Sequence, residues 1–221
     1  MGWEMQTLTE KVYKLAPPGG IFDETVVRNL FPTLSAGARK VLVYRAVKKS
    51  EVLRLRPGIY CLAEEYRKSA PHPFIVAGVL HSPSHISLES ALAYHGLIPE
   101  AVYQVTSVTA RRSRVFKTAL GVFSFERVPA RIPRAGVKAV RVGREGWAFV
   151  ASPLRAIADL VYLRKSVFWS RDGFDFLTSS LRIEEEDLVK IPLKDYGEVH
   201  ESIRNKRTRE YLAGLREALA R

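Results

Sequence analysis

The chain has 221 residues, of which 47% are hydrophobic and 26% charged, so it can bury a core in one large or two modest domains. Its single cysteine, Cys61, excludes an internal disulfide, and its longest apolar run, residues 74–80, is too short to span a bilayer, so we expect a soluble protein of the cytoplasm or nucleoid. The formal net charge is +12, and residues 146–221 hold 13 basic against 12 acidic side chains, so a polyanion is expected to bind the first two-thirds.

Three helices are predicted within the first fifty residues. Residues 3–15 carry apolar side chains at helical spacing and stop at the Pro-Pro-Gly-Gly run of residues 17–20. Asp23 is a suitable N-cap for a second short helix, which Pro32 closes. Ser35 is a suitable N-cap for a third helix, which extends to about residue 48.

The third helix is expected to be amphipathic. At about 100° per residue, small and apolar side chains fall on one side and a cationic stripe with one aromatic ring falls on the other. The apolar side holds Ala38, Leu42 and Ala46, and the cationic side holds Lys40, Tyr44 and Lys48. Three further cations, Arg39, Arg45 and Lys49, are expected nearer the packed side.

A basic hairpin follows directly. Residues 52–62 alternate between apolar and polar positions, with Arg54 and Arg56 on one face, and Pro57-Gly58 suits the two central positions of a tight turn. Three helices and a hairpin in this order are typical of a winged helix-turn-helix, so residues 1–68 are predicted to form such a domain.

This domain is expected to bind double-stranded DNA. Lys40, Tyr44 and Lys48 would enter the major groove, which is roughly 12 Å wide, while Arg54 and Arg56 on the wing would contact phosphates or the minor groove. We expect Arg39, Arg45 and Lys49 to be phosphate clamps or members of internal ion pairs. The alternative is a solvated helix face beside an ordinary exposed hairpin.

Residues 69–221 are predicted to form a second, mixed domain, so the fold class is α+β. Residues 63–83 form a connection that leads to a short buried element, and a helix covers residues 87–97. A small, mainly antiparallel sheet is built from strands at residues 102–109, 115–116, 122–128, 137–142 and 147–151. Packed helices follow: one that Ser152 and Pro153 begin, and others at residues 174–181 and 197–219.

The chain resembles the AbiEi family in two segments, SPSHISLESALAYHGLIPEAVYQVTSVTARRSRVFKTALGVFSFERVP at residues 82–129 and ASPLRAIADLVYLR at residues 151–164. The hairpin sequence RLRPGIY, residues 54–60, resembles the wing typical of that family. Members are transcriptional regulators that act as antitoxins of type IV abortive-infection toxin–antitoxin systems. The resemblance implies a winged helix that represses its own operon by binding inverted repeats upstream. It also implies a second domain that counteracts a nucleotidyltransferase toxin, generally without direct contact. We expect the protein to act as a monomer or a DNA-assisted dimer.

A second basic cluster lies between residues 103 and 144, where ten Lys or Arg side chains, Arg144 among them, accompany a single acidic one, Glu126. Arg111, Arg112 and Arg114 share one turn between two strands. These cations would extend the DNA footprint or grip an RNA through phosphate contacts, and the alternative is a set of solvated loops. A nucleic-acid-processing enzyme or an RNA-binding effector that uses this cluster is the second candidate function.

No catalytic site, metal site or cofactor is expected. His81, His85 and Glu89 have a spacing that would align metal ligands on a helix, but Pro83 interrupts that helix. The sequence lacks the common hydrolase and phosphate-loop motifs. A nuclease-like set can be assembled from Asp159, Asp172, Asp175, Asp187 and Lys190, although no spacing among them is diagnostic.

Overall fold

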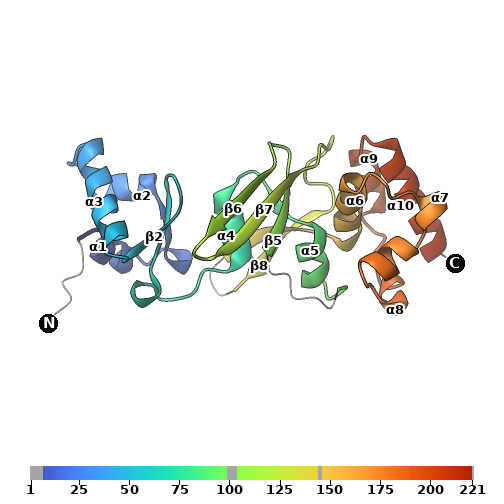
Figure 1. The fold of residues 1–221 in the computed structure, drawn as a ribbon, viewed down its shortest axis with the longest axis horizontal. Helices are drawn as coiled ribbons and strands as arrows, with labels where there is room; N and C mark the ends of the chain where they lie inside the picture. Colours follow the sequence, from blue (N-terminus) through green and yellow to red (C-terminus); the bar gives the residue numbers. More distant parts are fainter. Residues whose placement is uncertain (1–6, 99–103, 144–145, 221) are drawn as a thin grey trace. The chain divides into compact units, whose positions relative to one another are not determined.

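The computed structural model describes residues 7–98, 104–143 and 146–220, and its fold class is α+β (Figure 1). The chain divides into two compact units. The first comprises Met1–Leu80 with the short segments Phe116–Gly121 and Arg141–Trp147, and the second comprises the remainder. The first unit therefore continues past residue 68, where the sequence placed the boundary. Within the described residues, no helix combines the length and apolar character needed to cross a bilayer.

The first unit contains the three predicted helices and the predicted hairpin. Its helices and strands are α1 (Thr7–Leu15), a 3-10 turn (Pro18–Gly20), β1 (Ile21–Asp23), α2 (Glu24–Leu30), α3 (Ala36–Lys48), β2 (Val52–Arg56), β3 (Ile59–Leu62), a second 3-10 turn (Glu64–Tyr66) and α4 (Pro73–Leu80). Residues 3–6 of the first predicted helix lie outside the described residues. The predicted connection of residues 63–83 contains a regular helix, α4.

Side-chain caps begin the second and third helices as predicted. Asp23 Oδ1 accepts a hydrogen bond from the backbone N–H of Val26 at 2.9 Å. Ser35 Oγ accepts one from the backbone N–H of Ala38 at 3.1 Å. Each cap satisfies an N–H group that the helix itself leaves without a partner, which fixes where α2 and α3 begin.

The three-stranded sheet of the first unit is antiparallel, in the order β1-β3-β2. Strand β1, which the sequence did not predict, pairs Ile21 with Cys61. The hairpin contains a bulge, because Arg54 pairs with Tyr60 whereas Arg56 pairs with Ile59. A bulge leaves one residue, here Leu55, without a partner and re-aims the side chains around it. The simple alternation that placed Arg54 and Arg56 on one face therefore does not apply.

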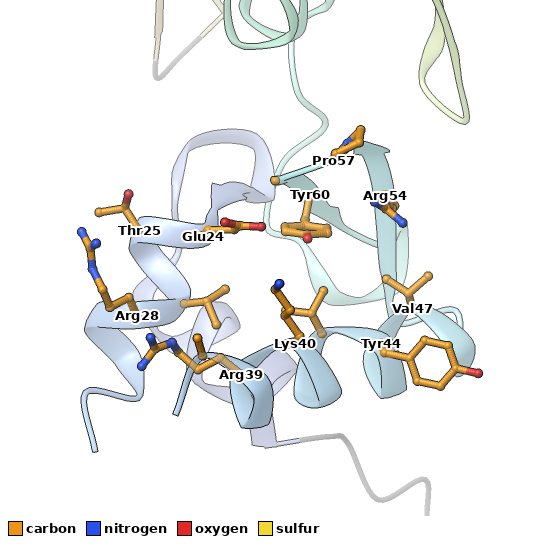
Figure 2. A pocket seen from close by; sticks show the side chains of 14 residues that line it. Glu24, Thr25, Arg28, Arg39, Lys40, Tyr44, Val47, Arg54, Pro57 and Tyr60 are labelled. Atoms are coloured by element: carbon orange, nitrogen blue, oxygen red, sulfur yellow. The ribbon is translucent and has the colours of Figure 1, made fainter. Parts of the chain in front are cut away.

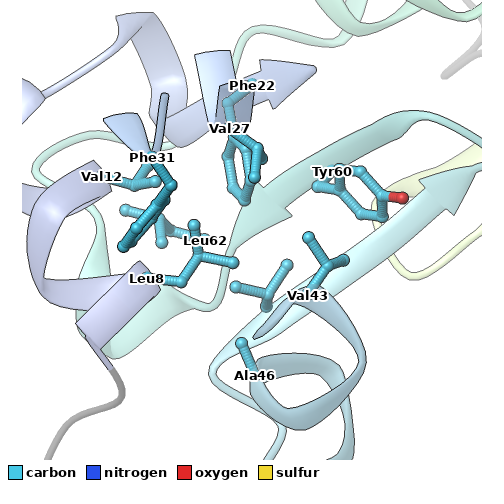
Figure 3. Close-up of a cluster of buried hydrophobic side chains, with 10 residues drawn as sticks. Leu8, Val12, Phe22, Val27, Phe31, Val43, Ala46, Tyr60 and Leu62 are labelled. Carbon is cyan, nitrogen blue, oxygen red and sulfur yellow. The ribbon is translucent and has the colours of Figure 1, made fainter. Parts of the chain in front are cut away.

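One hydrophobic core holds these helices against the sheet (Figure 3). It is formed by Leu8, Val12, Phe22, Val27, Phe31, Val43, Ala46, Val52, Tyr60 and Leu62. Val43 and Ala46 are the buried residues of α3. The buried side of α3 is therefore centred closer to Val43 than predicted. The predicted side, with Ala38, Leu42 and Ala46, lies part of a turn away.

The remaining elements form a six-stranded sheet and a group of helices. The strands are β4 (His85–Ile86), β5 (Gln104–Thr109), β6 (Arg114–Thr118), β7 (Gly121–Arg127), β8 (Val137–Val142) and β9 (Gly146–Ala151). The helices are α5 (Leu88–Tyr94), α6 (Pro153–Leu163), α7 (Trp169–Asp172), a π-helical turn (Phe176–Ser180), α8 (Glu185–Leu188), α9 (Tyr196–Ser202) and α10 (Lys206–Leu219). Residues 102–103 of the predicted strand 102–109 lie outside the described residues.

The larger sheet is mixed, which corrects the expectation of a mainly antiparallel one. Its strand order is β6-β7-β5-β4-β9-β8. Strand β4 pairs antiparallel with β5 but parallel with β9, and β5 pairs parallel with β7. The residue pattern of a strand does not show which other strand lies beside it in the sheet. Here β7 lies next to β5, and the two-residue strand β4 is too short to show a period of two.

The C-terminal helix is divided, although the sequence predicted one helix over residues 197–219. Helix α9 ends at Ser202, and Ile203 forms an isolated bridge with Ala130. Asn205 Oδ1 then accepts a hydrogen bond from the backbone N–H of Thr208 at 3.0 Å and begins α10. An internal cap of this kind restarts a helix in a new direction without a break in the apolar pattern.

Candidate nucleic-acid interface

A groove of about 630 Å³ opens on the first unit between α2, α3 and the β2–β3 hairpin (Figure 2). Basic side chains from all three elements line it. Arg28 comes from α2, Arg39 and Lys40 come from α3, and Arg54 comes from β2. Glu24 is the one acidic side chain among the residues that form its lining. The groove therefore has a positive balance, which favours an anionic ligand.

The predicted cationic side of α3 is exposed. Lys40, Tyr44 and Lys48 all lie at the surface, and the Tyr44 side chain is 64% exposed. Lys40 and Tyr44 also line the groove. An exposed aromatic ring between two lysines on one helix face provides both charge and a flat contact surface.

The three cations expected near the packed side of α3 have different environments. Arg39 Nη1 donates hydrogen bonds to the carbonyl oxygens of Phe31 (3.4 Å) and Leu34. Arg39 therefore holds the segment between α2 and α3, through carbonyls rather than an ion pair. Arg45 and Lys49 are exposed, because the buried side of the helix is centred closer to Val43 than predicted.

The two arginines of the hairpin also differ. Arg54 is exposed and lines the groove. Arg56 is half-buried, and its guanidinium donates to the carbonyl oxygens of Pro57 at 3.2 Å and Val79 at 3.4 Å. Arg56 thus links the hairpin to the end of α4, and Arg54 is the hairpin arginine that is exposed at the groove.

Arg28 was not singled out in the sequence, although it lines the same groove as Lys40. It is exposed on α2, one turn after Glu24. The available signal was its position: Val26, Val27 and Leu30 face the core, and helical spacing then places Arg28 on the outward side. Helix α2 therefore contributes a basic side chain to the groove, and a prediction based on α3 alone misses it.

The basic turn of the second unit is exposed as well. Arg111, Arg112 and Arg114 all lie at the surface around the connection from β5 to β6. Ser113 organises that connection: its hydroxyl donates to Glu126 Oε2 at 3.3 Å and accepts from the backbone N–H of Arg127 at 2.9 Å. Arg144, from the same sequence cluster, lies outside the described residues.

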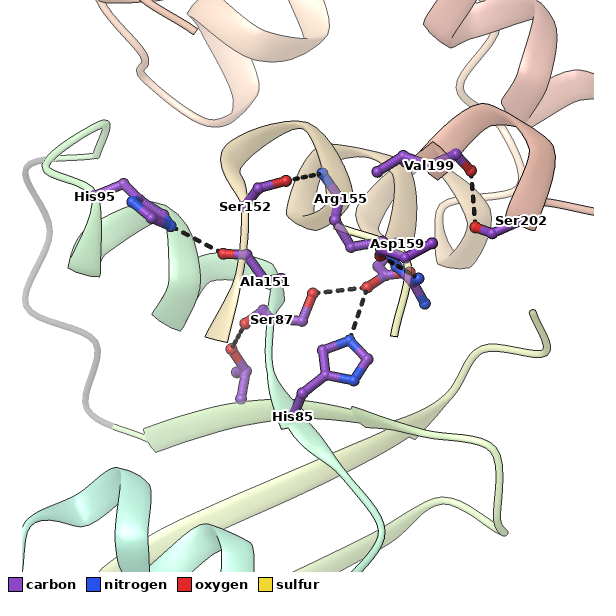
Figure 4. A network of polar contacts seen from close by, with 11 residues as sticks. His85, Ser87, His95, Ala151, Ser152, Arg155, Asp159, Val199 and Ser202 are labelled. Atoms are coloured by element: carbon purple, nitrogen blue, oxygen red, sulfur yellow. Dashed lines mark hydrogen bonds and ion pairs between the residues drawn. The ribbon is translucent and has the colours of Figure 1, made fainter. Parts of the chain in front are cut away.

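The carboxylates of the nuclease-like set do not form one site. Asp159 is 1% exposed, and Arg155 Nε donates to its Oδ1 at 2.9 Å while Ser87 Oγ donates to its Oδ2 at 2.7 Å (Figure 4). Asp172 pairs with Arg171 on α7, and Asp187 pairs with Lys190 at 2.8 Å. Among the described residues, no three His, Cys, Asp or Glu side chains converge as metal ligands.

The buried hydrogen bonds and charges around Asp159 join separate segments of the second unit. Burial alone raises the pKa of Asp159, but the Arg155 charge, the His85 imidazole 3.7 Å away and the hydrogen bond from Ser87 together lower it by more, so the pKa lies below its ordinary value. Arg155 Nη1 also donates to the carbonyl oxygen of Ala135 at 3.0 Å. Ser87 directly precedes α5, but its hydroxyl binds Asp159 and makes no capping hydrogen bond to the helix.

Neither a comparison with models of protein families nor a comparison with curated proteins found a match for this chain.

Proposed function

We propose that this protein is a DNA-binding transcriptional repressor and the antitoxin of a type IV abortive-infection toxin–antitoxin system. One observation carries the DNA-binding part: the exposed side of α3, with Lys40, Tyr44 and Lys48, adjoins the groove that Arg54 lines from the hairpin. A helix and a hairpin that present cations together match the way a winged helix binds duplex DNA. The resemblance to the AbiEi family supports the antitoxin part.

In the proposed complex, α3 enters the major groove. Lys40 and Tyr44 face base edges, where lysine donates to guanine acceptors and the tyrosine ring contacts a thymine methyl group. Arg54 binds a phosphate of the adjoining backbone, and Arg28 a second phosphate on the other side of α3. Each neutralised phosphate releases counterions, so the affinity falls as salt rises.

Arg39 and Arg56 have a positioning role in this proposal. Arg39 fixes the turn before α3, and Arg56 fixes the hairpin relative to α4, through the carbonyl contacts described above. A rigid support reduces the entropy lost when α3 and the hairpin contact DNA together. These two arginines therefore act on affinity through the shape of the surface.

The upstream region of the protein's own operon provides the direct test. We expect full-length protein to retard a duplex containing inverted repeats from that region and to protect the repeats from nuclease digestion. A duplex of the same length and base composition with scrambled repeats is the control. Equal retardation of both duplexes would refute a specific operator, and retardation of neither would refute DNA binding.

A second candidate function is RNA binding through the basic strands of residues 103–144. The observation that favours it is a cation–π contact in the second unit, where the Arg134 guanidinium lies 3.8 Å from the centre of the half-exposed Phe149 ring. Aromatic rings and arginines stack on unpaired bases. Tighter binding of single-stranded RNA than of the operator duplex, lost in Arg134→Ala, would favour this function.

A further inference from the structure

Glu24 places a negative charge in the otherwise cationic lining of the groove between α2, α3 and the hairpin. It is exposed, and in Figure 2 its side chain extends from α2 into the groove. A Cβ atom added at Gly58 would lie 3.7 Å from the carboxyl carbon and from Oε1 of Glu24, so the carboxylate lies beside the turn of the hairpin. A ligand that fills the groove up to the hairpin therefore meets this charge.

The Glu24 carboxylate has no partner within the described part of the chain. None of the basic side chains that line the groove pairs with it, and no other group donates to it. The turn beside it supplies no side-chain donor, because it consists of Pro57 and Gly58. The α2 dipole favours an acidic residue in the first turn of that helix, but it does not require a direction toward the hairpin. Both carboxylate oxygens are therefore free to accept hydrogen bonds from a ligand.

Duplex DNA interacts with such a carboxylate in two opposite ways. Its backbone carries one negative charge per roughly 1.7 Å of helix axis, so a phosphate close to Glu24 is repelled whatever the sequence. A base amino group, by contrast, donates to a carboxylate. Cytosine N4 and adenine N6 offer such a donor in the major groove, and guanine N2 offers one in the minor groove. Glu24 should therefore weaken binding to every duplex, except where the sequence places an amino group beside it.

We propose that Glu24 determines specificity in the groove by repelling the backbone of every duplex and accepting a hydrogen bond from the amino group of one operator base. This role rests on the DNA contact proposed above. Specificity is a difference between two affinities, and a repulsive group that only the correct partner satisfies increases that difference. Loss of Arg28 or Arg54 weakens binding to all DNA, whereas loss of the Glu24 charge strengthens binding to non-operator DNA.

Glu24→Gln tests the repulsion, because the amide has the size of the carboxylate without its charge. In anisotropy titrations of full-length protein at about 0.1 M salt, the variant should bind the scrambled duplex at least about threefold more tightly than wild type. It should bind the operator no more tightly than wild type, because a weaker hydrogen bond to the base offsets the lost repulsion. Glu64→Gln, at an exposed position outside the groove lining, is the matched control and should change both affinities by less than about twofold.

Glu24→Ala tests the hydrogen bond, because it removes the acceptor. The probes are operator duplexes that each lack one amino group: inosine replaces guanine, purine replaces adenine, or 2-pyrimidinone replaces cytosine. We expect wild type to bind one of these duplexes at least roughly fivefold more weakly than the operator, and Glu24→Ala to bind that duplex and the operator equally. The analogue that shows this pattern identifies the base and the DNA groove in which Glu24 contacts it.

Two results would overturn the role of Glu24 and leave the DNA-binding proposal in place. One is an equal effect of Glu24→Gln and Glu64→Gln on the two duplexes. The other is an equal response of wild type and Glu24→Ala to every duplex that lacks an amino group. Both Glu24 variants should keep native circular dichroism, since the side chain is exposed. If wild type binds neither the operator nor the scrambled duplex, the proposed function itself fails, and the role of Glu24 fails with it.

Discussion

Arg54 and Arg56 lie two residues apart on one strand but have different environments, because the bulge at Leu55 separates them. Arg54 is exposed at the groove, whereas Arg56 donates to the carbonyl oxygen of Val79 at 3.4 Å. In a regular strand the two side chains would share a face. The bulge therefore decides which hairpin arginine is exposed at the groove and which supports the hairpin.

Substitution of each arginine distinguishes these roles. Arg54→Ala should weaken operator binding and reduce the slope of log affinity against log salt by about one unit, without a change in stability. Arg56→Ala should lower the free energy of unfolding by about 1 kcal/mol, the usual value of a lost hydrogen bond, and leave the salt slope unchanged. Fluorescence anisotropy at several salt concentrations and urea unfolding measure the two effects. An unchanged slope for Arg54→Ala would remove Arg54 from the phosphate contacts.

The buried pair of Arg155 and Asp159 should control the acid stability of the second unit. The folded state lowers the pKa of Asp159 below the unfolded value of 3.8, so its contribution is fully present well above pH 3.8. The contribution is lost as the pH falls from there through the folded-state pKa. Unfolding followed by circular dichroism between pH 7 and pH 2 should show this loss in wild type and less of it in Asp159→Asn.

The same pair predicts a strong asymmetry between single and double substitutions. Asp159→Ala leaves the Arg155 guanidinium, which is 1% exposed, without its counter-charge and should cost about 3–5 kcal/mol. Replacement of both residues by apolar ones, Arg155→Met with Asp159→Leu, should recover most of that loss. A double variant no more stable than Asp159→Ala would show that the network stabilises the fold by more than charge compensation.

Arg207 on α10 should stabilise the end of α6. Its Nη2 donates to the carbonyl oxygens of Val161 at 2.7 Å and Tyr162 at 3.3 Å, and its Nη1 donates to those of Arg164 at 3.2 Å and Val167. The first two carbonyls belong to the last turn of α6, where the helix leaves acceptors unpaired, and the other two lie just after it. Only a guanidinium provides so many donors in one plane.

Arg207→Lys should therefore lower the free energy of unfolding by about 2 kcal/mol, because most of these acceptors lose their donor. Arg204→Ala, which removes an exposed arginine a few residues away, is the matched control and should change stability by less than about 0.5 kcal/mol. Thermal unfolding of the three proteins measures both. Equal stability of Arg207→Lys and wild type would mean that water replaces the lost bonds at no cost.

The local elements of the first unit were predictable because their signals are local. The caps at Asp23 and Ser35 and the turn at Pro57-Gly58 each fix a boundary within a few residues. The exposed face of Lys40, Tyr44 and Lys48 follows from helical periodicity alone. The order of three helices and a hairpin could therefore be predicted from the sequence.

The errors arise where distant segments decide the outcome. Strand β1 and the two-residue β4 are too short to have a pattern, and they exist because β3 and β5 offer them partners. The apolar run of α4 fits a buried strand or a buried helix equally well. The pairing of Arg155 with Asp159 depends on burial from all sides of α6, which one helical stripe does not predict.

Operator binding by α3 variants tests the DNA-binding proposal most directly. Anisotropy titrations of the upstream duplex at about 0.1 M salt should show losses of roughly 1–3 kcal/mol for Lys40→Ala and for Tyr44→Ala, with reduced discrimination against scrambled repeats. Arg204→Ala, which removes one charge from the second unit, should bind like wild type. If Lys40→Ala and Tyr44→Ala both bind the operator with wild-type affinity and discrimination, α3 is not the recognition element.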